Sequence, residues 1–172
     1  MAAVQAVLAA ARAVLLQECK KMTDRWTEIE STSEFLDADV VLLYWSLPGE
    51  VPTHDFIRRW SASKTIVLPR VVSRTEMELR VYDPEKMTEG RFHIQEPTED
   101  APLMPYDRIG LAIVPGTKFD LLGNRKGHGC GYYDRMLPNL SCPLFGVAFA
   151  ENIVDRLDVQ PHDVPVDRVF SF

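Results

Sequence analysis

The sequence predicts an α/β fold in which helices cover both sides of a mainly parallel sheet. Continuous apolar runs at residues 40–45, 109–114 and 144–150 are typical of strands that are buried on both faces. Helical segments lie between these runs, and the alternation implies right-handed crossover connections. A length of 172 residues fits one domain, so we expect a single unit spanning residues 1–172.

The chain is expected to begin with a helix. Apolar residues in the segment 1–16 repeat at the helical spacing of i, i+3, i+4 and i+7: Val4, Val7, Leu8, Ala11, Val14 and Leu15. The segment is too short for a membrane span and lacks the positively charged start of a signal peptide, so we expect a soluble helix docked by its apolar face. Residues 17–34 are polar and continue the helix in part, with Trp26 and Ile29 available for burial.

Two strands and a short helix follow. Pro48 and Gly49 end the first strand, at residues 40–45, and residues 54–60 read as a short helix. The apolar run at residues 65–68 predicts a second buried strand that Pro69 closes.

The rest of the chain alternates between regular and irregular segments. Residues 76–82 alternate apolar and polar side chains, which predicts a half-exposed strand. Residues 83–107 contain four prolines and little periodicity, and irregular excursions of this length are often lids or binding loops. After the strand at 144–150 we expect a helical turn at 153–157 and a last strand at 166–170. Ligands bind beyond the carboxyl ends of such parallel strands, so the loops that follow residues 45 and 114 are expected to share one cleft.

Residues 114–137 are the most informative stretch. They hold five of the nine glycines, and Gly127, Gly129 and Gly131 alternate with other residues, so the backbone can take positive φ angles and approach a ligand closely. A strand precedes this loop and a helix, expected at 132–137 and stopped near Pro138, follows it. Free N–H groups and the helix dipole converge at such a junction and can hold an anion. The window carries a net charge of +2 in a chain of −6, from Lys118, Arg125, Lys126 and Arg135 against Asp120 and Asp134.

The loop fits neither standard glycine signature. It lacks the Gly-Lys-Ser/Thr of a P-loop, and Tyr132 stands where a Rossmann loop needs its third glycine. Taken alone, the three alternating glycines are equally compatible with a tight surface turn. The wider pattern of Pro115-Gly-x-x-Phe-Asp, Gly123-Asn-Arg and Gly127-x-Gly-x-Gly-Tyr-Tyr-Asp-Arg closely resembles the signature of the 5-formyltetrahydrofolate cyclo-ligase family, also called methenyltetrahydrofolate synthetases. Further blocks in the same order extend this likeness from about residue 40 to the motif at residues 162–167.

The resemblance implies a three-layer α/β/α sandwich of the NagB/RpiA/CoA-transferase type. It also implies an ATP- and Mg²⁺-dependent conversion of 5-formyltetrahydrofolate into 5,10-methenyltetrahydrofolate, with release of ADP and phosphate. An amide oxygen is a poor nucleophile and hydroxide a poor leaving group, so phosphorylation of the formyl oxygen would activate the carbon for attack by N10. Such chemistry depends on positioning and charge neutralisation, and therefore needs a phosphate cradle, cations and a metal carboxylate.

By similarity, Arg125 and Asp134 are the candidate catalytic residues. The candidate ATP-binding residues are Arg12, Arg125, Gly127, His128, Gly129, Cys130, Gly131, Tyr133 and Asp134. Asp134 and Asp167 are the candidate carboxylates for Mg²⁺, a hard cation that prefers oxygen ligands. As bland alternatives, Asp134 could be an ordinary acid in the first turn of a helix and His128 could simply fill the loop.

For the folate, a flat pterin needs aromatic and apolar walls and a carboxylate for its ring N–H groups. Glu50 matches the carboxylate of the family, and the other substrate-binding candidates are Tyr44, Trp45, Met77, Phe92 and Tyr132. Taken singly, Tyr44, Trp45, Met77 and Phe92 are better explained by core packing, and Glu50 is equally well explained as a solvated turn residue.

One departure from the family concerns the first helix, which usually carries a Lys and an Arg that reach the nucleotide and here offers only Arg12. Two alternatives to the cyclo-ligase therefore stay open: a non-catalytic folate- or nucleotide-binding protein, and an ATP-using enzyme for a different formyl or acyl amide. The acidic balance and the lack of a basic stripe argue against nucleic-acid binding. The three cysteines show no paired spacing, which favours a reduced, cytoplasmic setting. We expect a monomer whose partners are a reduced folate and ATP.

Overall fold

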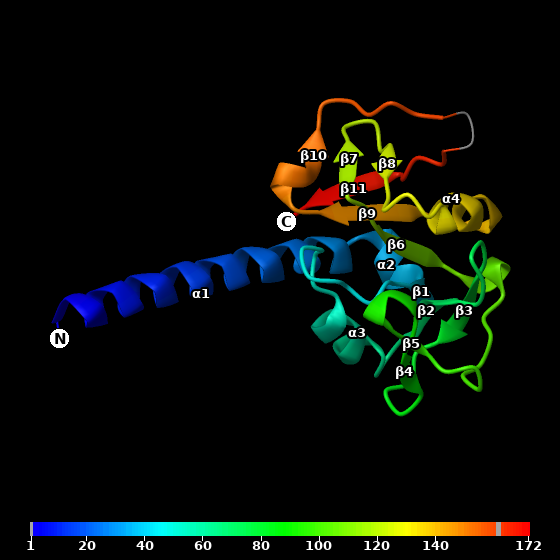
Figure 1. Cartoon of the computed structure of the whole chain (residues 1–172), viewed down its shortest axis with the longest axis horizontal. Helices are drawn as coiled ribbons and strands as arrows, with labels where there is room; N and C mark the ends of the chain where they lie inside the picture. Colours follow the sequence, from blue (N-terminus) through cyan, green and yellow to red (C-terminus); the bar gives the residue numbers. More distant parts are fainter. Residues whose placement is uncertain (1, 161–162) are drawn as a thin grey trace.

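A computed structural model describes residues 2–160 and 163–172 of the chain, and it describes the side chains of these residues except 2–4, 6, 18, 19, 21 and 92. A globular body carries one long helix, α1, that extends away from it (Figure 1). His162, in the motif at residues 162–167, lies outside the described residues.

The body is built around a six-stranded sheet with the strand order β11-β9-β6-β1-β2-β3. Only β3 runs antiparallel to its neighbour; the other five strands pair in parallel. This confirms the predicted α/β class with a mainly parallel central sheet. The strand bounds are β1 Val40–Leu42, β2 Thr65–Val71, β3 Met77–Val81, β6 Leu111–Pro115, β9 Leu144–Ala148 and β11 Arg168–Ser171.

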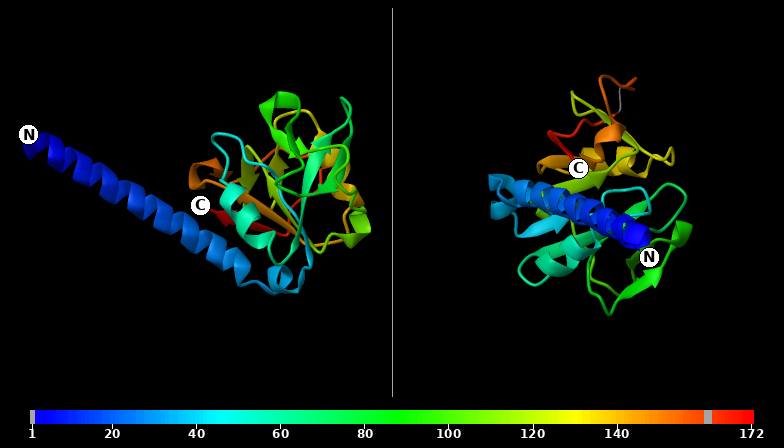
Figure 2. Two further views of the ribbon diagram at one scale, coloured as in Figure 1. Left: turned by 90° about the horizontal axis from the view of Figure 1, so that it is seen from below. Right: turned by 90° about the vertical axis from the view of Figure 1, so that its left-hand side faces the viewer.

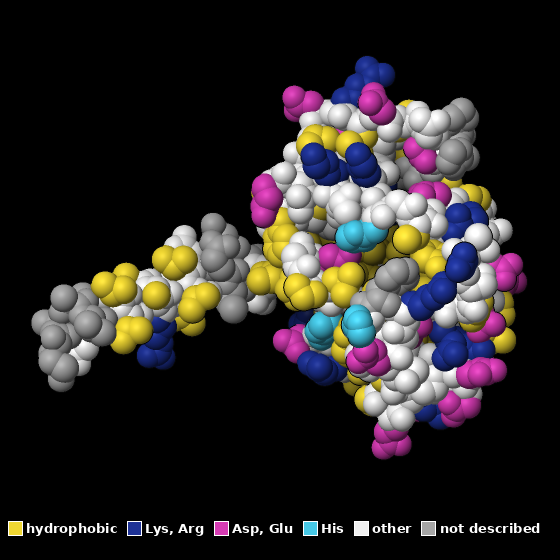
Figure 3. All heavy atoms as spheres, viewed as in Figure 1, with side chains coloured by type: hydrophobic (Ala, Val, Ile, Leu, Met, Phe, Trp, Pro, Cys, Tyr) yellow, Lys and Arg dark blue, Asp and Glu magenta, His cyan; other side chains and the backbone are white. Residues whose placement is uncertain are grey.

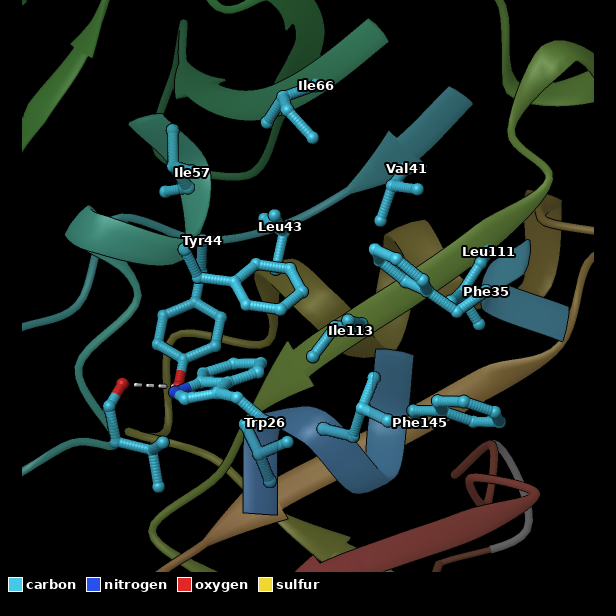
Figure 4. Packing of buried hydrophobic residues seen from close by; sticks show 14 of the residues in the cluster. Trp26, Phe35, Val41, Leu43, Tyr44, Ile57, Ile66, Leu111, Ile113 and Phe145 are labelled. Carbon is cyan, nitrogen blue, oxygen red and sulfur yellow. Dashed lines mark hydrogen bonds between the residues drawn. The ribbon is translucent and has the colours of Figure 1, made fainter. Parts of the chain in front are cut away.

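Helices cover one face of this sheet. Val41 and Leu43 point into a buried cluster that also contains Trp26, Phe35 and Phe56 (Figure 4). These three aromatic residues come from the end of α1 (Ala2–Glu30), from α2 (Ser33–Asp37) and from α3 (His54–Trp60). The helix expected at residues 54–60 is therefore confirmed. Successive side chains of a strand point to opposite faces of the sheet. Because both faces are buried here, every position of the strand must be apolar, which gives the continuous apolar run.

The opposite face is covered mainly by a second, smaller sheet. Val40 and Leu42 point into a cluster with Phe119, Met136 and Leu137. The covering elements are α4 (Tyr132–Met136), the 3-10 turn η3 (Leu137–Asn139), and a three-stranded sheet, β10-β7-β8, formed by Ile153–Val154, Lys118–Asp120 and Arg125–Lys126. Long helices do not cover this face in the described part of the chain, and the specific α/β/α sandwich that the resemblance implies stays a prediction.

The first helix forms as predicted but is not docked by its apolar stripe. Val7, Leu8, Val14 and Leu15 are 59–69% exposed, and the helix projects into solvent for most of its length (Figure 2). Alanine-rich sequence of this length favours a helix without tertiary support. Only its C-terminal turns bury side chains, Trp26 and Ile29, against the body. None of the described helices is long and apolar enough to cross a membrane.

Proline does not end the second strand. β2 continues through Pro69 to Val71, because Pro69 directs its backbone nitrogen past the end of β1, where no strand partner requires an N–H group. The excursion at residues 83–107 is also more regular than expected. It contains the hairpin of β4 (Met87–Glu89) and β5 (Gln95–Pro97), with the 3-10 turn η1 (Arg91–His93) between them.

Two 3-10 turns flank later strands, and one of them differs from the sequence prediction. The turn η2 (Tyr106–Arg108) leads into β6. The helical turn expected at 153–157 is displaced to the 3-10 turn η4 (Ala150–Asn152), and Ile153 and Val154 form β10 by pairing with β7. A two-residue strand depends on its partner and leaves no periodic signal in the sequence.

Candidate functional site

The loops after β1 and β6 meet at the carboxyl ends of their strands, as the sequence predicts. They line a cavity of about 400 Å³, which we call the apolar cavity. Figure 3 shows the globular body hollowed on this face, with apolar side chains inside the hollow. Its walls include Tyr44, Trp45, Glu50, Pro69, Val71, Met77, Gln95, Glu96, Gly116, Arg125, Tyr132, Tyr133, Asp134 and residues 127–131.

The glycine loop, residues 127–131, does not follow directly from the buried strand. The β7–β8 hairpin intervenes, so Arg125 lies on a strand immediately before the loop. The helix after the loop, α4, has only five residues, and its dipole is a weak basis for anion binding. The expected order of strand, loop and helix therefore needs this correction.

Glycine is required in the loop for close approach and for backbone conformation. A Cβ atom on Gly127 would lie 2.8 Å from Arg125 Nη1, and one on Gly131 would lie 2.6 Å from Arg135 Nη1. Gly129 and Gly131 have φ angles of 85° and 68°, in the left-handed region. Two guanidinium groups can therefore pack against the backbone of the loop.

Both ends of the loop are held. At its end, Tyr132 Oη donates to the carbonyl of Ser73 at 3.0 Å and Arg135 Nε donates to that of Thr75 at 2.7 Å, so the loop rests on the turn between β2 and β3. At its start, the side chain of Arg125 is only 4% exposed and lies over the ring of Tyr133, with 5.3 Å between Cζ and the ring centroid.

Arg125 and Asp134 form an ion pair at the floor of the loop. The carboxylate is 34% exposed, so it faces open space while the guanidinium is buried. Within the described residues, Arg125 Nε is the one buried side-chain nitrogen or oxygen without a hydrogen-bond partner. Burial raises the pKa of the neighbouring Tyr133 phenol, and the Glu50 carboxylate raises it further. Tyr133 therefore stays neutral beside the pair.

A second hollow, of about 390 Å³, lies on the other side of the loop. This polar hollow shares Arg125, Gly127, Gly129 and Asp134 with the apolar cavity and is completed by Lys126, Arg156, Leu157, Asp158 and Asp163. The glycine loop and the ion pair thus form a wall between an apolar and a polar compartment.

Glu50 and His128 connect the loop to the opposite rim of the apolar cavity. Glu50 Oε2 accepts a hydrogen bond from the Leu47 backbone N–H at 2.8 Å, and Oε1 lies 3.3 Å from His128 Nε2. Tyr44 is buried and donates its hydroxyl hydrogen to the Val51 carbonyl at 2.8 Å (Figure 4). Burial raises the pKa of Tyr44, with a further contribution from the Glu50 carboxylate.

Most of the residues singled out from the sequence meet at this wall. The structure brings together Tyr44, Trp45, Glu50, Met77, Arg125, Gly127, His128, Gly129, Cys130, Gly131, Tyr132, Tyr133 and Asp134. Arg12 is not among them, since it is exposed on the projecting part of α1. The Phe92 side chain lies outside what the structure describes; its backbone belongs to η1.

Asp167 is not brought to Asp134. Its Oδ2 accepts a hydrogen bond from the Leu144 N–H at 2.7 Å, at the amino end of β9, and it lines a separate hollow. No group of three or more His, Cys, Asp or Glu residues that could hold a metal ion is found in the described part of the chain.

Two supporting residues escaped sequence reasoning. Asp120 is fully buried, and its carboxylate accepts hydrogen bonds from the Leu122, Asn124 and Leu157 N–H groups and from the Asn124 amide. Burial alone would raise the pKa of Asp120, but these four hydrogen bonds lower it below its usual value. Phe119, also fully buried, fills the space beneath β7. The Phe-Asp pair inside the glycine-rich motif was the available signal, since an acid next to a buried aromatic residue needs hydrogen-bond donors.

A glycine loop beyond the carboxyl ends of a parallel sheet, with a two-part site around it, places the chain among α/β proteins that bind ligands at this edge. Comparison with known families is more specific. Residues 3–171 match the 5-formyltetrahydrofolate cyclo-ligase family, and the chain belongs to that family of enzymes.

Individual relatives agree with this assignment. The chain is 31% identical over 142 residues to the 5-formyltetrahydrofolate cyclo-ligase of Escherichia coli K12, covering 78% of each chain. It is 31% identical over 134 residues to that of Haemophilus influenzae, covering 73% of this chain and 72% of the relative. The solved structure of Aquifex aeolicus 5,10-methenyltetrahydrofolate synthetase superposes with a TM-score of 0.79 at 30% identity, over 90% of this chain and 80% of the other.

Proposed function

We propose that this protein converts 5-formyltetrahydrofolate into 5,10-methenyltetrahydrofolate at the expense of ATP, with Mg²⁺, releasing ADP and phosphate. The observation that carries the proposal is the wall formed by the glycine loop and the Arg125–Asp134 pair between an apolar and a polar compartment. A reaction between a flat, largely apolar substrate and a nucleotide needs this arrangement, because the reacting groups must meet where the two sites touch.

The polar hollow fits the phosphates of a nucleotide. The glycines leave the backbone of the loop open to a ligand, while Arg125, Lys126 and Arg156 supply positive charge beside the carboxylates of Asp134, Asp158 and Asp163. The unpartnered Arg125 Nε shows that the ion pair with Asp134 leaves the guanidinium incompletely satisfied. His128, Cys130 and Tyr133 line the apolar side of the same loop, and we propose that they contact the nucleotide where the two compartments meet.

Asp134 is the proposed carboxylate for Mg²⁺. Its side chain is partly exposed and lines both compartments. Mg²⁺ commonly takes only one or two protein carboxylates beside water and substrate phosphates, so the lack of a larger cluster does not conflict with the assignment. Asp167 is left out of this proposal because it lies at the other end of β9.

The apolar cavity fits the folate. Tyr44, Trp45, Met77 and Tyr132 offer apolar and aromatic walls, and Glu50 adds a carboxylate beside the glycine loop. A pocket of about 400 Å³ lies within the range of small-molecule sites.

The residues of the wall would serve the reaction by charge and position. ATP supplies a phosphoryl group to the formyl oxygen, after which N10 attacks the formyl carbon, loses its proton, and phosphate departs with that oxygen. Arg125 would neutralise charge that develops on the transferred group, and the walls of the cavity would hold N10 beside the formyl carbon and exclude water. We further expect a cytoplasmic monomer.

The proposal is tested by following the absorbance of the conjugated methenyl product with 5-formyltetrahydrofolate and MgATP. We expect product formation that requires both ATP and Mg²⁺. Asp134→Asn should lower kcat by about 100-fold or more, since metal coordination contributes several kcal/mol to transition-state stabilisation. Asp24→Asn, the same change on the exposed surface of α1, should leave kcat unchanged. Normal turnover by Asp134→Asn would refute the site. ATP binding without turnover would support the non-catalytic alternative or a different amide substrate.

A further inference from the structure

Glu96 is a buried carboxyl group on the wall of the apolar cavity that the proposed reaction does not use. It lies on β5, in the β4–β5 hairpin beside β2 (Figure 1), and its exposed fraction is 5%. Acidic residues are rarely buried to this extent without a partner.

The position of this carboxyl group is fixed by the fold. Glu96 Oε2 accepts a hydrogen bond from the Val71 N–H at 3.3 Å, on the side of β2 that extends past the end of β1. Arg70 Nη1 donates to the Pro97 carbonyl at 3.0 Å and ties β5 to β2. Gly90 directly follows β4, and a Cβ atom on it would lie 2.2 Å from Glu96 Oε2. The carboxyl group can therefore occupy its place only because residue 90 is glycine.

The second oxygen of Glu96 is left for a ligand. Oε1 accepts no hydrogen bond from the described residues. Arg125 Nε is the one side-chain nitrogen or oxygen there that is both fully buried and without a partner. Oε1 also has no partner, so it cannot be fully buried. Oε1 is therefore accessible and unpaired on a residue that lines the apolar cavity.

Glu50, the other carboxylate of the cavity, differs in this respect. One of its oxygens accepts from the Leu47 N–H and the other faces His128. Burial raises the pKa of Glu96, although the Val71 N–H and the positive charge of Arg70 oppose that rise. A carboxylate held in such surroundings gains more from new N–H donors than one that is already paired.

We propose that Glu96 receives the N–H donors of the pterin, namely N3–H and the 2-amino group, and so determines which heterocycle enters the cavity. This inference rests on the proposed function. The two donors are adjacent on the pyrimidine ring, and one carboxylate can accept both: Oε1 is unpaired, and Oε2 has a second lone pair beside its hydrogen bond from Val71. These donors lie at the end of the pterin away from N5, which carries the formyl group. Glu96 likewise lies on a different element, β5, from the residues proposed to act at the formyl group, which come from β8 and α4.

The test compares binding of 5-formyltetrahydrofolate with binding of its 2-desamino analogue, without ATP, by titration calorimetry. The wild-type protein should bind the analogue about 10- to 100-fold more weakly, the effect of losing a charge-assisted hydrogen bond. Glu96→Gln should bind 5-formyltetrahydrofolate more weakly by a similar factor and should no longer distinguish the two compounds. In turnover it should raise KM and leave kcat within about threefold. Glu89→Gln, the same change at an exposed position of β4, should leave the affinity for both compounds unchanged.

Three results would overturn the inference. Glu96→Gln could bind both compounds as the wild type does, it could lose affinity for both equally, as a purely structural role predicts, or the wild type could fail to distinguish them. Glu96→Asp, which keeps the charge, should retain part of the discrimination and serves if the glutamine variant is unstable. A wild-type protein that binds no reduced folate would refute the proposed function itself.

Discussion

Phe119 is held between two glycines, and this packing predicts the effect of a single methyl group. A Cβ atom added to Gly146, in β9, would lie 2.4 Å from Cε1 of the ring. A Cβ atom added to Gly116 would lie 2.6 Å from Cε2 on the other side. Carbon atoms in van der Waals contact are about 3.5–4.0 Å apart, so a methyl group at Gly146 would overlap the ring by about 1 Å.

Gly146→Ala is therefore expected to destabilise the fold. The ring is fully buried and β9 lies between β6 and β11, so neither side can move freely. Overpacking of this kind costs about 1–3 kcal/mol. For a chain of this size each kcal/mol lowers Tm by about 2–4 °C, which gives an expected fall of about 2–12 °C.

Urea unfolding followed by tryptophan fluorescence measures this effect, with Phe119→Leu as the companion variant. The shorter leucine should relieve the overlap, so the double variant should be more stable than the sum of the two single effects by about 1 kcal/mol. Phe119 pairs with Arg125 across β7 and β8, so turnover should also fall in Gly146→Ala and partly recover in the double variant. A Gly146→Ala protein as stable as the wild type, or strictly additive effects, would show that the ring is not confined as described.

Two further predictions concern residues outside the wall. Arg12→Ala should leave the KM for ATP within about twofold of the wild-type value, because Arg12 is exposed and is not among the residues that line the polar hollow. A large increase in this KM would mean that α1 folds back over the site in solution. His54 stacks on Trp45 with 4.3 Å between the ring centroids, and burial lowers the pKa of its imidazole despite the opposing effect of the Ser46 backbone. The unfolded chain therefore binds the proton more readily, so the stability that neutral His54 permits is fully present above about pH 6.5 and is lost as the pH falls through the lowered pKa. Thermal unfolding between pH 7 and pH 5 should show this loss in the wild type and a flatter profile in His54→Gln; identical slopes would contradict it.

Local sequence patterns identified the parts of the fold that local forces determine. Burial on both faces left continuous apolar runs at β1, β6 and β9, which predicted these strands. The bounds of α3 were predicted correctly because this helix is short and clearly delimited. Pro69 misled the prediction, since its effect depends on where the neighbouring strand ends. Likewise, β10 exists only through its pairing with β7.

The site was predictable where it is continuous in sequence. Residues 127–134 and Arg125 lie together because the chain keeps them together. The contact between Glu50 and His128 joins residues 78 positions apart, and no spacing rule reports it. The place of Glu96 depends on the docking of a hairpin within a segment that looked irregular. Arg12 and Asp167 were assigned by resemblance alone, and the structure places them away from the wall.

The two anchored ends of the glycine loop affect the entropy of ligand binding. Arg125 fixes the chain on one side and the bonds of Tyr132 and Arg135 to the β2–β3 turn fix it on the other, so rearrangement is confined to the five residues 127–131 between them. Fixing the backbone of one residue costs about 1–2 kcal/mol, so a short, tethered loop limits the ordering penalty that a nucleotide must overcome. The glycines, which would be the most costly residues to immobilise in an open loop, are thereby partly ordered before any ligand arrives.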